Sequence, residues 1–145
     1  MQAAARLDLP LTVVGDGPTR RRLEAAAGPK TRFLGYQSDA VVEKLYRSSA
    51  ALLFAGVEDF GIVPVEAIAR GCPVVALAAG GCVETILPGE TGVFFSEPSV
   101  DDCAAAIERC LSLTWNPAEM HARAERFAPQ TFRTAVRNWL PTWVS

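Results

Sequence analysis

Two carboxylates flank the start of a predicted helix in the segment from Glu58 to Glu66. Pro64 suits the first turn of that helix, because the N–H that proline lacks would be unpaired there anyway. The backbone amides of residues 61–63 then point outward at the positive end of the helix dipole, which favours a diphosphate. Glu58 and Glu66 offer carboxylate oxygens that accept hydrogen bonds from sugar or ribose hydroxyls. This block therefore predicts a site for a phosphate-bearing sugar compound.

The spacing of these two carboxylates is weak evidence by itself. The chain holds ten glutamates among 145 residues, so a pair at this separation is expected by chance. A solvated glutamate in the first turn of a helix is the ordinary alternative. The elements around the block must therefore decide between the two interpretations.

Short β-branched strands alternate with helical stretches, a pattern typical of an α/β fold with crossover helices. We expect a mostly parallel sheet with helices on both faces. Ligands bind outside the carboxyl ends of such strands. A glycine follows almost every strand; each alone is more simply a tight turn, but together they favour a phosphate-bearing ligand. The predicted strands are 11–14, 32–34, 51–54, 74–77 and 93–95, the predicted helices are 18–27, 38–47, 63–69, 83–87, 99–113, 117–127 and 130–140, and the glycines are Gly15, Gly17, Gly35, Gly56, Gly61, Gly80 and Gly81.

Length and charge exclude several classes of protein. The 145 residues are enough for one domain, expected over 1–145 with a helix at about 128–145. Fourteen Lys and Arg against sixteen Asp and Glu leave a net charge of −2, so a basic footprint for nucleic acid or an anionic membrane surface is absent. No transmembrane segment and no signal peptide is predicted, and we expect a cytoplasmic protein.

The four cysteines and the single histidine do not form a metal-binding pattern. No CxxC pair occurs and His121 has no cysteine near it, so no metal is expected. Cys72, Cys82, Cys103 and Cys110 are most simply buried thiols, although the spacing is compatible with a disulfide between the first two. His121 is expected to be a surface helix residue rather than a catalytic one.

The order and the gaps of several short motifs match one known family. From Gly15 to Phe95 the chain resembles the carboxyl-terminal half of retaining glycosyltransferases of the GT-B fold, in glycosyltransferase family 4. The resemblance implies a Rossmann-like domain that holds a nucleotide-sugar in a cleft facing a second domain. The matching motifs are Val13-Val-Gly-Asp-Gly-Pro18, Phe33-Leu-Gly35, Glu58 to Ala67, Gly71-Cys-Pro-Val-Val75, Gly80-Gly81 with Glu84, and Gly89-Glu-Thr-Gly92.

This resemblance implies roles for individual residues. Glu58 matches the catalytic-site glutamate that contacts the donor sugar, and Glu66 matches the one that holds the ribose hydroxyls. The motifs from Asp59 to Glu66 and from Gly80 to Glu84 look most like mannosyltransferases of surface-polysaccharide synthesis, which favours GDP-mannose over a UDP-sugar; no further cofactor is implied. The implied donor-binding residues are Gly15 and Gly17 near the phosphates, Arg32, Phe33 and Leu34 along the base, and Phe60, Gly61, Ile62 and Val63 beside the diphosphate or sugar.

The resemblance also implies parts that this chain does not contain. In the family, a first strand and a loop with an Arg and a Lys that clamp the diphosphate stand before residues 1–9, which look like the end of the following helix. An acceptor domain is missing as well. Lys30 and Lys44 do not match the clamp by position, and Arg20 to Arg22 are expected to be solvated because consecutive residues fan around a helix. We therefore expect little sugar transfer by this chain alone.

In the family's strand order, the missing strand lies in the middle of the sheet. The strands 11–14 and 51–54 are then expected either to pair with each other or to leave open edges, which invite association. Trp139 and Trp143 add apolar surface that is expected to be exposed. Partial self-association follows as a prediction.

Three function classes remain at this point. The first is the donor-binding half of a retaining glycosyltransferase that moves a hexose to a glycan or lipid-linked acceptor. The second is a non-catalytic module of the same fold that binds a nucleotide or a partner chain. The third is a GT-B sugar-nucleotide epimerase, which is disfavoured because the sequence from Glu58 to Glu66 resembles that of mannosyltransferases. Glu84 fits a capping residue and a cleft residue equally well, and Asp16 is expected to accept hydrogen bonds in its own turn.

Overall fold

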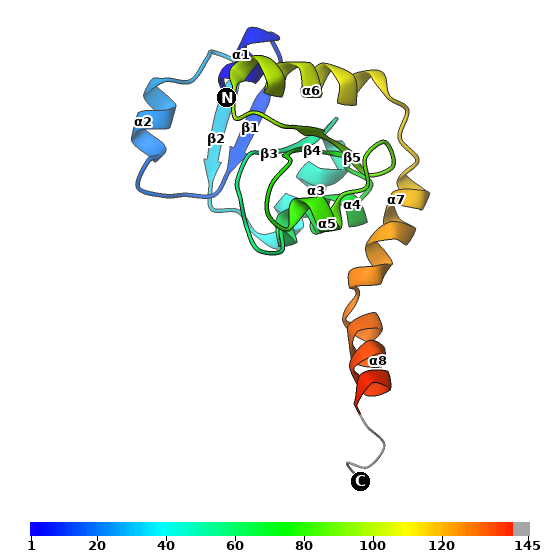
Figure 1. Ribbon diagram of the computed structural model, residues 1–145. Coiled ribbons are helices and arrows are strands. Elements are labelled where there is room, and N and C mark those ends of the chain that lie inside the picture. Colours follow the sequence, from blue (N-terminus) through cyan, green and yellow to red (C-terminus); the bar gives the residue numbers. More distant parts are fainter. Residues whose placement is uncertain (141–145) are drawn as a thin grey trace.

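Strands and helices alternate along the chain in the computed structural model, which describes residues 1–140 (Figure 1). All the predicted elements are present, with ends that differ by a few residues. The strands are β1 (Leu11–Val14), β2 (Thr31–Gly35), β3 (Leu52–Phe54), β4 (Val74–Leu77) and β5 (Gly92–Phe95). The helices are α1 (Gln2–Arg6), α2 (Arg20–Ala25), α3 (Asp39–Ser48), α4 (Ile62–Ala69), α5 (Cys82–Thr85), α6 (Val100–Ser112), α7 (Pro117–Ala124), the 3₁₀ helix η1 (Glu125–Phe127) and α8 (Pro129–Trp139).

One predicted helix start, that of the helix over 18–27, is wrong. Pro18 lies before α2 rather than in its first turn, because residues 17–20 form a turn in which the Arg20 amide bonds the Gly17 carbonyl at 3.1 Å. Ser38 occupies the N-cap position of α3, but its side chain makes no capping hydrogen bond. By contrast, the Ser99 hydroxyl at the start of α6 accepts from the Asp102 amide at 3.1 Å, as N-cap serines commonly do.

The strands form two parallel sheets, which is one of the two arrangements that the sequence left open. One sheet contains β1 and β2, and the other has the order β3-β4-β5. Within the described residues, β1 and β3 do not pair, so the chain takes the second of the two expected outcomes and leaves open edges. The two-stranded sheet and α2 lie to one side of β3-β4-β5 in Figure 1.

The backbone hydrogen bonds identify which groups form these open edges. The amides of Leu11 and Gly15 bond to carbonyls of residues 30 and 35 on the β2 side. The backbone N–H and C=O groups of consecutive residues in a strand point to opposite edges of that strand. Those of Thr12 and Val14 therefore face away from β2. In β3 the Leu52 amide bonds the Pro73 carbonyl at 2.8 Å, and Leu53 therefore faces away from β4.

The side chains of β4 divide the core into two clusters, one on each face of its sheet. Val74 and Ala76 pack with residues of α4, α5 and α7. Val75 packs with residues of α6, β5 and α1. This alternation with a period of two places helices on both faces. The α/β class and the parallel arrangement with helices on both faces are thus confirmed.

The last helix, α8, contributes no buried residue and projects away from the sheets in Figure 1. The Trp139 side chain is 80% exposed and Phe132 is 68% exposed, so the expectation for Trp139 is confirmed. Trp143 lies outside the described residues. None of the helices within residues 1–140 is long and apolar enough to cross a membrane. Self-association stays a prediction.

Candidate functional site

Helix α4 begins within one residue of the start that the sequence predicted beside the candidate anion site. Gly61 is the N-cap residue with φ +81°, a left-handed conformation that favours glycine. Ile62 and Val63 open the helix, and Pro64 follows as a buried residue of the first turn. The first amides of a helix lack acceptors within it, so those of Ile62 and Val63 are available to a ligand. Their partial positive charge favours an anion.

A pair of glycines brings the loop after β4 against the loop after β3. The Gly81 amide donates to the Glu58 carbonyl at 2.7 Å. A Cβ on Gly81 would lie 2.4 Å from the backbone carbonyl oxygen of Asp59, and a Cβ on Gly80 would lie 2.5 Å from the backbone carbonyl oxygen of Glu58. Side chains larger than hydrogen are therefore excluded from both positions in this arrangement. The two glycines fix where Glu58 lies relative to α4.

The two sequence-predicted carboxylates differ in their surroundings. Glu58 is exposed, whereas Glu66 on α4 is half-buried. The Tyr46 hydroxyl on α3 donates to Oε2 of Glu66 at 3.5 Å, a long hydrogen bond. Burial, and secondarily the Glu66 carboxylate, raise the pKa of Tyr46 to about 12. A phenol is protonated at neutral pH at its ordinary pKa as well, so Tyr46 is a donor that faces Glu66 at neutral pH.

Tyr46 was missed as a site residue by the sequence analysis. It lies twenty residues before Glu66, and nothing in that spacing joins the two. The available signal was a phenol among the apolar residues of one face of helix 38–47, since a buried tyrosine hydroxyl usually finds a polar partner.

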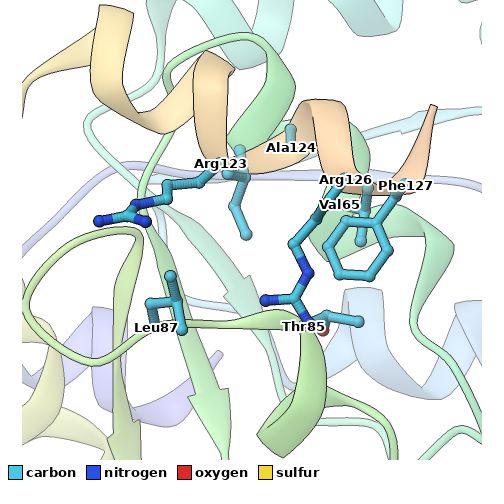
Figure 2. Close-up of a pocket in the computed structure, with 8 residues that line it drawn as sticks. Val65, Thr85, Leu87, Arg123, Ala124, Arg126 and Phe127 are labelled. Atoms are coloured by element: carbon cyan, nitrogen blue, oxygen red, sulfur yellow. The ribbon is translucent and has the colours of Figure 1, made fainter. Parts of the chain in front are cut away.

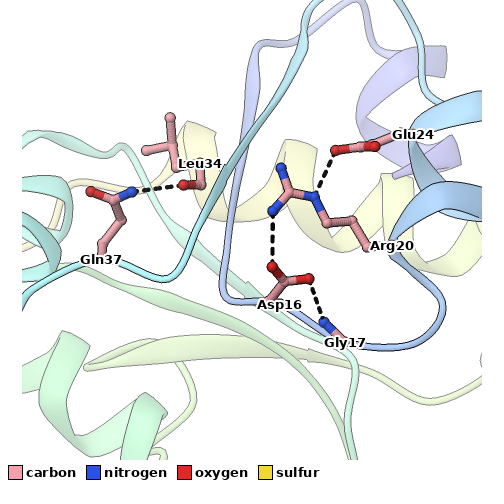
Figure 3. Close-up of polar contacts among 6 residues, drawn as sticks. All are labelled: Asp16, Gly17, Arg20, Glu24, Leu34 and Gln37. Carbon is pink, nitrogen blue, oxygen red and sulfur yellow. Dashed lines mark hydrogen bonds and ion pairs between the residues drawn. The ribbon is translucent and has the colours of Figure 1, made fainter.

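The glycine loop after β1 is held by its own aspartate, as predicted (Figure 3). Asp16 Oδ1 accepts from the Gly17 amide at 2.8 Å, and Oδ2 accepts from Arg20 at 3.1 Å. Arg20 also donates to Glu24 at 2.7 Å. Its guanidinium covers Gly35 so closely that a Cβ there would lie 2.8 Å from Nη1. Arg20 is thus a structural bridge rather than the purely solvated residue that was expected, because the turn at Asp16 places a carboxylate beside it.

The three residues of β2 that were predicted to line a base differ in their exposure. Arg32 is exposed, whereas Phe33 and Leu34 are half-buried. The Leu34 carbonyl already accepts from the Gln37 side chain at 2.7 Å (Figure 3). A carbonyl oxygen has two lone pairs, so it retains one for a ligand.

The contacts group the candidate residues into two pairs of loops. The loops after β3 and β4 meet at Glu58 and Gly81, and the loop after β1 meets the end of β2, where the Gly15 amide donates to the Gly35 carbonyl at 2.8 Å. Within residues 1–140 no hydrogen bond or ion pair joins one pair of loops to the other. The predicted site therefore consists of two separately built halves.

The other candidate residues of the sequence analysis are His121, Glu84 and the four cysteines. His121 is exposed, with Nδ1 2.9 Å from the Ala69 carbonyl oxygen. Glu84 is exposed in the first turn of α5, where no side-chain capping bond forms. All four cysteines are free and buried, as expected, and the disulfide alternative is wrong. Burial raises the pKa of Cys82, and the Glu58 carboxylate adds to this. Among residues 1–140 no cluster of three His, Cys, Asp or Glu could hold a metal.

A family model decides what kind of chain this is. Residues 1–130 match the family described as "Glycosyl transferases group 1". The chain belongs to this family. Among curated relatives, this glycosyltransferase chain is 34% identical over 108 residues to an uncharacterized glycosyltransferase of Methanocaldococcus jannaschii, covering 70% of the chain and 28% of the relative. It is 34% identical over 120 residues to a glycogen synthase of Mycobacterium tuberculosis, covering 79% and 28%.

Solved structures, a galactosyltransferase among them, have the same fold. The Anabaena protein HepE in complex with UDP-glucose matches with a TM-score of 0.76 and 25% identity, over 94% of this chain and 42% of that one. The lipopolysaccharide outer core galactosyltransferase WaaB matches with a TM-score of 0.72 and 22% identity, over 91% and 41%. This glycosyltransferase chain therefore spans about a quarter to two fifths of the length of the proteins it matches.

Proposed function

We propose that this chain is the donor-binding half of a retaining glycosyltransferase that moves a hexose from a nucleotide-sugar to a glycan or lipid-linked acceptor. One observation carries the proposal: the exposed residues Ile62 and Val63 open α4, and in the chain they stand between Glu58 and Glu66. A diphosphate fits the amides, and sugar hydroxyls fit the carboxylates. Membership of the family supports the reaction class.

The two carboxylates are proposed to hold different parts of the donor. Glu66 lies within α4, is half-buried and faces the Tyr46 hydroxyl at 3.5 Å, and it takes the ribose hydroxyls. Glu58 lies before the helix on the exposed loop and takes hydroxyls of the transferred sugar. The amides of Ile62 and Val63 stabilise the charge that develops on the leaving diphosphate. Retaining transfer in this arrangement requires no base from this half.

The identity of the donor has support from two relatives that differ. HepE, at 25% identity, is solved with UDP-glucose. The alpha-1,3/1,6-mannosyltransferase alg-2 of Neurospora crassa is 38% identical over 81 residues, covering 55% of this chain and 17% of that protein. We propose a nucleotide-hexose donor, and titration of the chain with GDP and with UDP distinguishes GDP-mannose from a UDP-sugar.

Charge variants of the two glutamates test the assignment. Glu66→Gln is expected to weaken UDP or GDP binding about tenfold, because it removes a charge-assisted hydrogen bond to the ribose. Glu58→Gln is expected to leave the free nucleotides unaffected and to weaken the nucleotide-sugar. Glu108→Gln on the exposed side of α6 is the matched control. Isothermal titration calorimetry gives the dissociation constants, and unchanged affinities in Glu66→Gln would contradict the proposal.

We also propose that transfer needs a second half that binds the acceptor and clamps the diphosphate with cations. The chain alone is then expected to give no transfer from GDP-mannose or UDP-glucose at ordinary enzyme rates. Addition of a separately produced amino-terminal half should restore it. Turnover by this chain alone would overturn that expectation, and nucleotide binding without restored transfer would favour the non-catalytic module.

A further inference from the structure

The short segment after α7 lies against the loop after β3 and against α5. The Phe127 ring meets the Phe60 ring edge-to-face, with centroids 5.5 Å apart and planes at 84°. Phe60 directly precedes Gly61, the N-cap of α4. The Arg126 guanidinium carbon lies 4.6 Å from the centroid of the Phe127 ring, and its Nη2 donates to the Glu84 carbonyl on α5 at 3.2 Å. The two-residue unit Arg126–Phe127 therefore contacts both the loop after β3 and α5, the helix that directly follows Gly81.

Helix α7, which precedes this unit in the chain, is packed into the core. Met120 is completely buried and Ala124 is 7% exposed, so α7 is anchored in the core cluster below α4. Figure 2 shows Arg126 and Phe127 over Thr85 and Val65, which belong to α5 and α4. By contrast, residues 55–60 of the loop after β3 are all exposed. The anchored unit can thus limit the motion of the exposed loop.

We propose that Phe127, supported by Arg126, is a positioning residue of the donor site, which holds the loop from Glu58 to Gly61 through the ring of Phe60. The inference rests on the proposed function for the meaning of that loop, but the contact stands without it. Edge-to-face geometry constrains both the distance and the orientation of Phe60. A leucine would fill much of the space without that constraint.

The test compares Phe127→Leu with Phe127→Tyr, which keeps the ring, and with Phe132→Leu as control, because Phe132 is a 68% exposed phenylalanine on α8. Amide NMR spectra of the nucleotide-free chain report the loop through Gly61 and Gly81, and calorimetry reports UDP and GDP affinity. Phe127→Leu is expected to shift both amide peaks and to weaken binding about fivefold, the order of one edge-to-face contact. Phe127→Tyr and Phe132→Leu should behave as wild type.

Each result decides the matter. Unshifted Gly61 and Gly81 peaks in Phe127→Leu would overturn the positioning role, whether or not nucleotide binds. A wild-type chain that binds neither nucleotide refutes the proposed function separately. If Phe127→Leu does not fold, Arg126→Gln at an exposed position replaces it, with smaller shifts of the same peaks expected and an unchanged spectrum as the overturning result.

Discussion

The close approach of Gly81 to the loop after β3 makes Gly81→Ala a sharp test of the site. Gly81 has φ −63° and ψ −16°, so alanine is compatible with its backbone. The obstacle is contact alone, because the new Cβ would lie 2.4 Å from the Asp59 oxygen and 2.5 Å from the Phe60 Cα. Non-bonded heavy atoms have their most favourable separation at about 3.5 Å or slightly more. The loop must therefore move by about 1 Å.

The free energy of this movement follows from the contacts that change. Overpacking costs about 1–3 kcal/mol. Loss of the hydrogen bond from Gly81 to Glu58, 2.7 Å long, costs roughly 1 kcal/mol. Because residues 58–60 are exposed, the loop can move outward without disturbing the core, which keeps the total near the lower end. We expect Tm to fall by several degrees, at about 2–4 °C per kcal/mol.

Binding should suffer more than stability. A hydrogen bond to a charged group contributes about 1.5–3 kcal/mol. If Glu58 moves by about 1 Å away from the sugar hydroxyls, nucleotide-sugar affinity is therefore expected to fall by roughly tenfold to a hundredfold. Gly56→Ala in the same loop is the control, because its Cβ would meet Phe54 at an ordinary 3.5 Å. Calorimetry and thermal unfolding measure both quantities. A Gly81→Ala chain with wild-type affinity would refute the claim that the two glycines position Glu58.

Three further outcomes are expected. Met120→Ala in the buried position on α7 should lower the free energy of unfolding by about 2–5 kcal/mol in urea titrations, whereas Leu111→Ala, 44% exposed, should change it by less than about 1 kcal/mol. Burial raises the pKa of Cys72 and of Cys110 to about 11, so both thiols should resist alkylation at pH 8 until the chain unfolds. Since the pKa is higher in the folded state, the stabilisation is complete below the ordinary thiol pKa and is lost as pH rises toward 11, which a Tm series from pH 8 to 11 measures. The open edges of β1 and β3 should cause concentration-dependent self-association, and a constant monomer mass in light scattering would contradict this.

The sequence predicted the elements well because their signals are local. Proline and glycine placed the start of α4 within one residue, and the period of two in β4 placed helices on both faces. The division into two sheets was left open, because strand pairing depends on which strands meet in space. Pro18 was misplaced for a local reason: a turn and a helix start use the same residues.

The site was predictable only as far as contiguous motifs reach. In the block from Glu58 to Glu66 and at the glycines 80–81, the local sequence itself indicates the backbone conformation. Tyr46, Arg126 and Phe127 reach the site across twenty or more residues of chain, and a single sequence carries no trace of such contacts. Arg20 was misjudged similarly, because its packing on Gly35 joins α2 to the end of β2, fifteen residues later in the chain.

The division of the candidate site between two sheets has a consequence for local stability. From Ala5 to Leu34 no residue is buried, so the β1–α2–β2 unit with its glycine loop has few contacts to resist opening. The half around α4 stands on both core clusters instead. Amide hydrogens of β1 and β2 should therefore exchange first, through local unfolding. A donor that touches both halves would act as a clamp, and its binding free energy would appear as slower exchange in the weaker unit.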